Sequence, residues 1–332
     1  MTMKRLLPLA VIALTACSTV PEPPAGEAAP GAEDAQRERE RLDQRRRDFN
    51  AVLVRLDQAM DSYVQAMANR GELRADEQAR RLEKLLRDLV LDSGGQSYTV
   101  QQGDVEVAGS VPGGNYQRLV ALAADGSRPE QQAIALAALG FSGRMEVMPK
   151  ILQGAMLSDP FVVDRAVLGL AVLQSPDTKP GVLGAIVEND SHPEDGRVQA
   201  AWALYRIQEV LADQEPIVEL WIRYLTTERQ RMPAGVIVTA VRGLGLARDP
   251  AHADLVATFL KHPVPRVRMS AALALGRMNA QDHWQDLLNL LGSQETVQNV
   301  RLHARKALAA LAGDRDYGYD VAAWQKVFDR GQ

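Results

Sequence analysis

Apolar residues in the C-terminal two thirds of the chain recur in pairs of amphipathic stretches. Each pair contains one segment rich in alanine and leucine, with a leucine at an equivalent place. These anchor leucines are Leu139, Leu170, Leu204, Leu244, Leu275 and Leu308, so they lie 31, 34, 40, 31 and 33 residues apart. Two helices repeated every 30 to 40 residues are typical of an α-solenoid. We therefore predict an all-α fold, with about six helix pairs over residues 116–332.

The N-terminal residues 35–92 show a different helical pattern. Apolar residues follow one another at alternating steps of four and three, as in a helix seam: Phe49, Leu53, Leu56, Met60, Tyr63 and Met67. After a stop at Gly71, residues 75–91 place Leu82, Leu85, Leu86 and Leu89 on one predicted face. The pattern favours an antiparallel helical hairpin. A coiled-coil dimer is the alternative, although fewer than four clean heptads support it.

Two segments flank the predicted solenoid. Residues 93–115 are rich in glycine and serine, and their alternating pattern predicts either two short strands or an irregular connector. The C-terminal tail concentrates aromatic residues at Tyr317, Tyr319, Trp324 and Phe328. A solenoid needs a cap over its last open core, so we predict an aromatic cap rather than an aromatic ligand site.

One repeat carries a specific motif. Residues 267–276 read VRMSAALALG, which resembles the V-R-x-x-A-A-x-A-L-G core of HEAT repeats, in particular the short HEAT-like type first noted in phycobilin lyases. Looser copies surround Arg197 and Arg301. The resemblance implies a solenoid with a long binding surface. It implies no lyase activity, because the shared element is the scaffold and function depends on the site.

The first residues indicate export. Residues 1–16 contain a basic start and a short apolar run, which is typical of a signal peptide and too short to span a bilayer. The residues before Cys17 read LTA, so residues 14–17 resemble the lipobox of bacterial lipoproteins. The resemblance implies cleavage before Cys17 and lipid attachment to its thiol. Residues 17–34 then predict a disordered, proline-rich spacer.

These features predict a cell-envelope protein that reaches the membrane through lipid on Cys17. Ser18 rather than aspartate follows the cysteine, which implies the outer membrane, facing the periplasm, if the organism is Gram-negative. The chain has one cysteine, so no disulfide is expected in the folded part. With a net charge of −4 and no basic block, nucleic acid is not an expected partner.

Candidate chemistry is sparse. The five histidines occur singly, without metal-ligand spacing, and no catalytic or cofactor-binding motif is present, so we expect no metal, no cofactor and no enzyme activity. Charged residues on the repeat helices are candidates for a partner-binding face: Asp164, Arg165, Arg197, Arg266, Arg268 and Arg301. Such residues more often form ion pairs between repeats or a solvated surface.

The expected function is a membrane-anchored scaffold that binds an envelope protein or peptide along the solenoid. Two alternatives stay open. The first is an envelope enzyme or small-ligand carrier that uses the concave face, which a deep pocket with convergent polar groups would favour. The second is a structural protein that oligomerises through the N-terminal helices.

Overall fold

The computed structural model describes residues 32–68, 73–92, 97–102, 105–110 and 114–329, in two compact units. The predicted signal peptide, Cys17 and the spacer up to residue 31 lie outside the described residues. In the first unit, residues 1–48, the described part begins helix α1 (Ala32–Ala68). This helix starts within the predicted spacer, and its side chains are exposed from Asp34 to Asp48.

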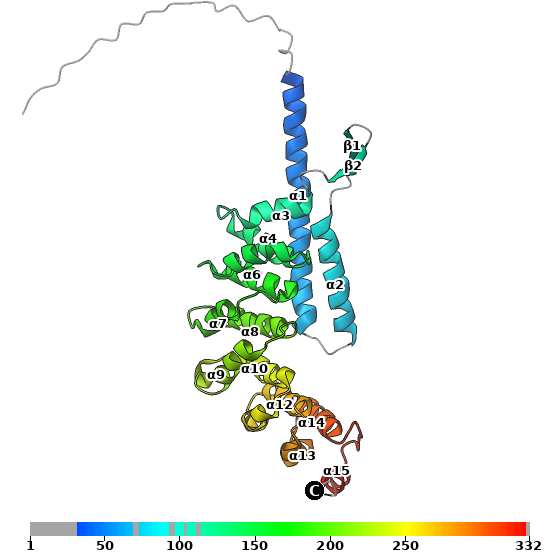
Figure 1. Cartoon of the computed structure of the whole chain (residues 1–332), viewed down its shortest axis with the longest axis vertical. Helices are drawn as coiled ribbons and strands as arrows, with labels where there is room; N and C mark the ends of the chain where they lie inside the picture. The colour runs from blue at the N-terminus through cyan, green and yellow to red at the C-terminus, as the bar shows by residue number, and fades with distance from the viewer. Residues whose placement is uncertain (1–31, 69–72, 93–96, 103–104, 111–113, 330–332) are drawn as a thin grey trace, which may run out of the picture. The chain divides into compact units, whose positions relative to one another are not determined.

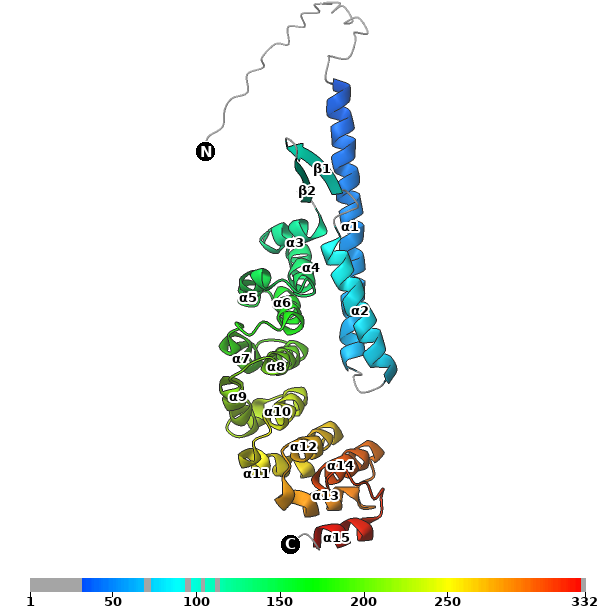
Figure 2. The same ribbon diagram turned by 45° about the vertical axis from the view of Figure 1, so that its right-hand side comes forward.

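The second unit, residues 49–332, contains the predicted solenoid. Its helices form six pairs, stacked one after another (Figure 1, Figure 2). The pairs are α3 (Asn115–Ala123) with α4 (Pro129–Gly140), α5 (Met148–Gly154) with α6 (Pro160–Leu173), α7 (Pro180–Glu188) with α8 (Glu194–Gln208), α9 (Glu215–Leu225) with α10 (Ala234–Ala247), α11 (Ala253–Ala257) with α12 (Pro265–Arg277), and α13 (Trp284–Leu291) with α14 (Gln298–Leu311).

The helices make two rows. The second member of each pair packs against the second member of the next, so α4, α6, α8, α10, α12 and α14 form the second row. Short 3-10 turns lie between some helices: η1 (Met145–Val147), η2 (Arg229–Arg231), η3 (Pro250–His252), η4 (Thr258–Lys261) and η5 (Gln281–His283). The two-row stack confirms the predicted α-solenoid.

The anchor leucines explain how the second row is held together. All six have no exposed surface, which places the repeats in the predicted register. Small residues allow adjacent second-row helices to approach closely. A Cβ atom added to Gly140 of α4 would lie 2.3 Å from the carbonyl oxygen of Gly169 of α6, so only glycine fits there.

Local sequence explains where the helices begin and end. Proline occupies the first turn of α4, α6, α7 and α12, where its missing N–H costs no hydrogen bond. Asp159 caps α6 by accepting a hydrogen bond from the backbone N–H of Phe161 at 3.0 Å. At the other end of α6, Gln174 adopts the left-handed conformation with φ 49°, which stops the helix.

The predicted hairpin is present as α1 and α2 (Leu73–Leu91). The α1 seam from Phe49 to Tyr63 is buried within the chain rather than free for a coiled-coil partner. One expectation was wrong: Leu85 does not share the buried face of α2 and is 42% exposed. Ala79, Leu82, Leu86 and Leu89 instead follow the four-and-three spacing that keeps a single face inward.

The connector contains two antiparallel strands, β1 (Ser97–Gln102) and β2 (Val105–Ser110), with Ser97 opposite Ser110. The strand alternative predicted for residues 93–115 is therefore observed.

At the C-terminus, α15 (Val321–Asp329) packs against α13. Trp324 is completely buried, and Phe328 stacks on Trp284 with ring centroids 5.1 Å apart. These contacts cover the end of the last repeat with aromatic rings.

Candidate protein-binding surface

One line of residues runs along each second-row helix on the side where α1 lies. In each helix it has four positions relative to the anchor leucine. Three lie before it, at nine, five and two residues, and the fourth lies two residues after it. These steps of four, three and four keep the residues on one side of a helix. We call this set of positions the inner stripe. In α6, with Leu170 as anchor, it consists of Phe161, Arg165, Leu168 and Val172.

The part of α1 in the second unit docks on the inner stripe of α4 and α6. Phe141, two residues after the α4 anchor, meets Tyr63 edge-on with ring centroids 5.2 Å apart. Arg165 of α6 forms an ion pair with Asp57 at 2.8 Å and donates a hydrogen bond to Asp61 at 2.9 Å. The two aspartates lie one turn apart on α1, so both carboxylates reach one guanidinium.

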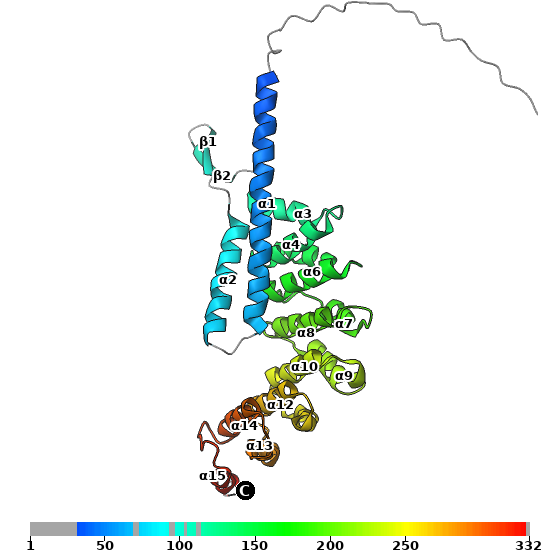
Figure 3. The same cartoon turned by 180° about the vertical axis from the view of Figure 1, so that it is seen from behind.

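This docking buries part of the stripe. Leu168, two residues before the α6 anchor, is only 1% exposed. The equivalent residues further along the second row are Arg242 in α10 and Lys306 in α14, and both are exposed. The part of α1 nearest its C-terminal end lies alongside α4 and α6 (Figure 1; seen from behind in Figure 3). Among the described residues, α1 therefore covers the central part of the inner stripe at α4 and α6, although Phe161 at its start stays exposed. Over α10, α12 and α14 the stripe is exposed or half-exposed except at Ser270.

The open part of the stripe is basic. Arg266 and Arg277 occupy stripe positions on α12 and are exposed, and Arg242 of α10 donates a hydrogen bond to the buried Ser270 hydroxyl at 3.1 Å. Burial among the neighbouring helices lowers the pKa of the Arg242 guanidinium, although its side chain still reaches solvent. The positive charges of Arg277 and Arg266 lower that pKa further.

Three predicted site residues share a different role. Arg197, Arg268 and Arg301 each lie seven residues before an anchor leucine. Arg197 donates to the Val187 carbonyl at 2.8 Å and Arg301 donates to the Leu291 carbonyl at 3.0 Å. Arg268 donates to two carbonyls, at His262 and Pro263, and pairs with Glu295 at 2.8 Å.

Arg197 and Arg301 therefore satisfy carbonyls in the last turn of the preceding helix, which lack partners within that helix, and Arg268 satisfies two carbonyls in the turn after η4. Arg197 is also only 7% exposed. The six predicted site residues consequently do not form one surface. Arg165 and Arg266 belong to the inner stripe, whereas Arg197, Arg268 and Arg301 hold consecutive helices together.

Asp164 is engaged inside the solenoid. Its carboxylate lies 2.7 Å from the His192 Nε2 atom, and its backbone carbonyl accepts a hydrogen bond from Gln199 at 2.9 Å. Burial raises the pKa of the Asp164 carboxyl, and the hydrogen bond with His192 opposes that rise. No third ionisable group completes a catalytic arrangement with this pair among the described contacts, so we assign the pair to packing between α6 and α8.

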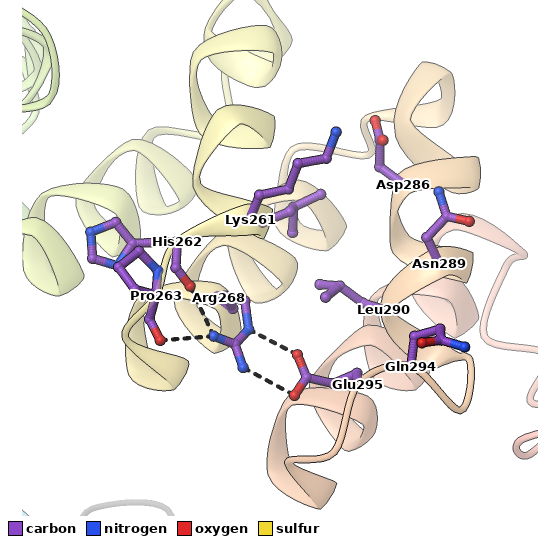
Figure 4. A pocket seen from close by; sticks show the side chains of 10 residues that line it. Lys261, His262, Pro263, Arg268, Asp286, Asn289, Leu290, Gln294 and Glu295 are labelled. Carbon is purple, nitrogen blue, oxygen red and sulfur yellow. Dashed lines mark hydrogen bonds and ion pairs between the residues drawn. The ribbon is translucent and has the colours of Figure 1, made fainter.

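A pocket of about 330 Å³ lies between η4, the start of α12 and α13 (Figure 4). Its walls include both signs of charge: Lys261, His262, Arg268, Asp286 and Glu295. Arg268 and Glu295 are already paired across one wall, as Figure 4 shows. Burial lowers the pKa of the His262 imidazole, and so does the charge of Arg229. The paired charges of Arg268 and Glu295 thus stabilise the wall of the pocket and do not point into its open space.

Within the ranges given above, no group of three histidine, cysteine, aspartate or glutamate side chains could hold a metal ion. No helix in those ranges is long and apolar enough to cross a bilayer.

Sequence reasoning missed three exposed cations of the open inner stripe, namely Arg242, Arg277 and Lys306. The leucine spacing already aligned the repeats with one another. Comparing equivalent positions in that alignment would have grouped these three residues with Arg266. The sequence did not indicate which side of the second-row helices α1 covers.

Comparison with known proteins supports the repeat assignment. Residues 218–309 match the family model for HEAT repeats. No curated protein matches the chain in sequence. Among solved structures, the chain is similar to one in the complex of CpcE and CpcF of phycocyanin lyase from Nostoc sp. PCC7120, with 16% sequence identity and a TM-score of 0.35. The similarity covers 80% of this chain and 92% of that chain.

This likeness corrects the expectation that the chain is not an enzyme. The solved structure is described as part of a phycocyanin lyase, and a repeat scaffold by itself does not exclude enzyme activity. At this TM-score the likeness also assigns no reaction to the chain. The stacked helix pairs, the buried anchor leucines and the family match agree on the architecture. The chain therefore contains a HEAT-like repeat domain, built as an α-solenoid.

Proposed function

We propose that this chain is a lipid-anchored protein of the bacterial cell envelope that binds a partner protein along its inner stripe. The observation that supports partner binding most strongly is that the stripe already holds a helix. The Phe49–Met67 part of α1 lies on α4 and α6 through an aromatic contact to Phe141 and a shared ion pair to Arg165. A surface that accommodates one amphipathic helix has the shape and chemistry to accommodate another.

The free length of the stripe favours this function. A solenoid grows by adding repeats, and each new pair extends the same surface. The chain covers that surface itself over the first second-row helices and leaves it open over α10, α12 and α14. An extended, partly occupied surface suits a macromolecular partner better than a small molecule, which needs an enclosed cavity.

The anchor is tested by metabolic labelling of cells with an alkynyl fatty acid. The matched variants are Cys17→Ser, which removes the thiol, and Ser18→Ala, which leaves it. The proposal predicts labelled, membrane-associated wild-type and Ser18→Ala proteins and an unlabelled Cys17→Ser protein. An unlabelled wild-type chain would contradict lipid attachment while leaving partner binding open.

Partner binding is tested by photo-cross-linking in the same cells. A benzophenone amino acid replaces Leu273, on the inner stripe of α12, or Glu219, an exposed residue of the first-row helix α9. The proposal predicts a discrete protein adduct from position 273 and none from position 219. Equal adducts from both positions, or none from position 273 with the protein folded and exported, would refute binding along the stripe.

A further inference from the structure

The open inner stripe has a composition that points to one kind of partner. Resting on the proposed function, we infer that the cations of α10, α12 and α14 bind an acidic amphipathic helix of the partner protein. The cations are Arg242, Arg266, Arg277 and Lys306, and we call them the basic stripe. The partner helix would lie on them as α1 lies on α6.

The covered part of the stripe supplies the template. There, Arg165 receives two carboxylates from consecutive turns of α1, at 2.8 and 2.9 Å. Tyr63 of α1 adds an aromatic contact to Phe141 at the end of α4. The basic stripe continues those positions along the second row, so the same pairing of carboxylate to guanidinium is available there to an incoming helix.

The cations of the basic stripe are not neutralised by an acid within the described residues. None of the four forms an ion pair there, whereas Arg206, Arg231 and Arg305 of the same solenoid each pair with a carboxylate at 2.7 Å or less. Arg242 is held in place by Ser270 but is not neutralised by it. Cations that crowd one another and lack an acid repel, and an anionic partner relieves that repulsion.

Apolar residues between the cations favour a helix over other anionic partners. Leu273 and Leu246 lie at stripe positions and are half-buried. The equivalent Leu168 of α6 is buried at the docked α1. A phosphate-bearing surface would pair with the arginines but leave both leucines in water, whereas an amphipathic helix covers them.

The spacing of the stripe arginines sets how a partner helix meets them. Arg266 and Arg277 are eleven residues apart on α12, or about 16 Å along a helix that rises 1.5 Å per residue. Because the docked part of α1 crosses α4 and α6 rather than running along either helix (Figure 1), a partner in the same pose meets these two arginines across its width. A carboxylate pair one turn apart, like Asp57 and Asp61, then engages one arginine at a time.

The test uses fluorescence anisotropy with a labelled peptide as the probe. The peptide has the sequence of residues 49–67, which contains Asp57, Asp61 and the seam that docks in the chain. Its control carries Asp57→Asn and Asp61→Asn. The receptor is the full chain with Cys17→Ser, so that no lipid is attached.

Receptor variants separate the basic stripe from general charge. The first combines Arg242→Gln, Arg266→Gln and Arg277→Gln. The matched control combines Arg248→Gln, Arg315→Gln and Lys326→Gln, which removes the same charge from exposed residues outside the stripe. Circular dichroism melting checks that both variants stay folded.

We expect the stripe variant to raise the Kd of the acidic peptide about tenfold and the control variant to change it less than twofold. The Asn peptide should bind the unsubstituted chain about tenfold more weakly than the acidic peptide. Equal affinity of both receptor variants for the peptide would overturn the inference. It would also be overturned if Arg165→Gln abolished peptide binding and the stripe variant still bound the peptide.

Vesicles containing 30% phosphatidylglycerol provide the other arm. Stripe-dependent binding to vesicles without any peptide binding would overturn the helix and assign the cations to a lipid surface. This failure is distinct from failure of the proposed function. An adduct at position 273 with no peptide binding would leave a partner on the stripe but exclude an acidic helix.

Discussion

The Arg165 guanidinium donates to the Asp61 carboxylate at 2.9 Å across 104 positions of sequence. The Arg165 side chain is only 14% exposed, so α1 covers the guanidinium, whereas the Asp61 side chain is 58% exposed. Through this contact, the N-terminal hairpin covers a surface that the solenoid repeats would otherwise expose. The structure thereby shows what the inner stripe can bind, and with which groups.

Loss of this contact should loosen the hairpin. Arg165→Gln leaves Asp57 and Asp61 without their cation, so we expect unfolding free energy to fall by about 1–3 kcal/mol. Hydrogen exchange should quicken in α2 and in residues 49–68 before the rest of the solenoid. Arg55→Gln, at an exposed residue of α1, is the control. Unchanged exchange in α2 would show that the ion pair does not hold the hairpin.

Glycines in the repeats should respond to alanine according to their surroundings. A Cβ at Gly243 would lie 2.1 Å from the Trp221 Nε1 atom, whereas a Cβ at Gly181 of α7 meets nothing within 4 Å. Gly243→Ala should therefore cost about 1–3 kcal/mol through overpacking. Gly181→Ala should stabilise by up to about 1 kcal/mol because helical alanine is favoured over glycine. Urea unfolding of both variants measures the difference; equal effects would argue against close packing at Gly243.

The aromatic cap should protect the last repeat. Trp324 is fully buried and donates a hydrogen bond to the Gly318 carbonyl at 3.0 Å. Trp324→Ala should cost about 3–5 kcal/mol and increase exchange first in α13 and α15. Tyr319→Ala, which removes a 40% exposed ring nearby, serves as the control. If both substitutions cost the same, the cap does not depend on Trp324.

The Glu295 carboxyl should make the free energy of unfolding depend on pH. Burial would raise the pKa of its carboxyl, but hydrogen bonds from Arg268 and the Val297 backbone N–H lower it below the ordinary value. The folded chain thus binds this proton less readily than the unfolded chain. The contribution is complete above the unfolded pKa of about 4.3 and disappears as pH falls through the lower folded value.

The Glu295→Gln variant measures that contribution. Its stability deficit relative to the unsubstituted chain should be about 1–3 kcal/mol and constant from pH 8 to about pH 5, and should shrink below about pH 4.3. Glu219→Gln, at an exposed first-row residue, should show no such change. A deficit that persists at pH 3 would contradict the sign of the pKa shift.

Periodic features of the sequence predicted the solenoid well. Leu139 and Leu308 begin and end a regular series, and both are fully buried because each repeat presents the same face to its neighbours. Leu85 was misplaced because four leucines within eight residues occupy more than one side of a helix, and spacing alone did not choose which side meets the solenoid.

The candidate surface was less predictable from sequence. Arg165 and Arg197 look alike as arginines on repeat helices, yet one meets carboxylates of α1 and the other meets the Val187 carbonyl. That difference depends on where a helix from the distant N-terminus docks, which no local pattern contains. The same applies to Arg242, which is exposed because no helix of the described residues docks over it at α10.

Arginine footprinting of the full chain with hydroxyphenylglyoxal tests most directly whether the stripe has a covered and an open part. Mass spectrometry would follow modification of each arginine over time. We expect fast modification of Arg242, Arg266 and Arg277 and slow modification of Arg165. In the Asp57→Asn, Asp61→Asn variant, Arg165 should also be modified fast. An Arg165 that reacts as fast as Arg266 in the unsubstituted chain would contradict this division of the stripe.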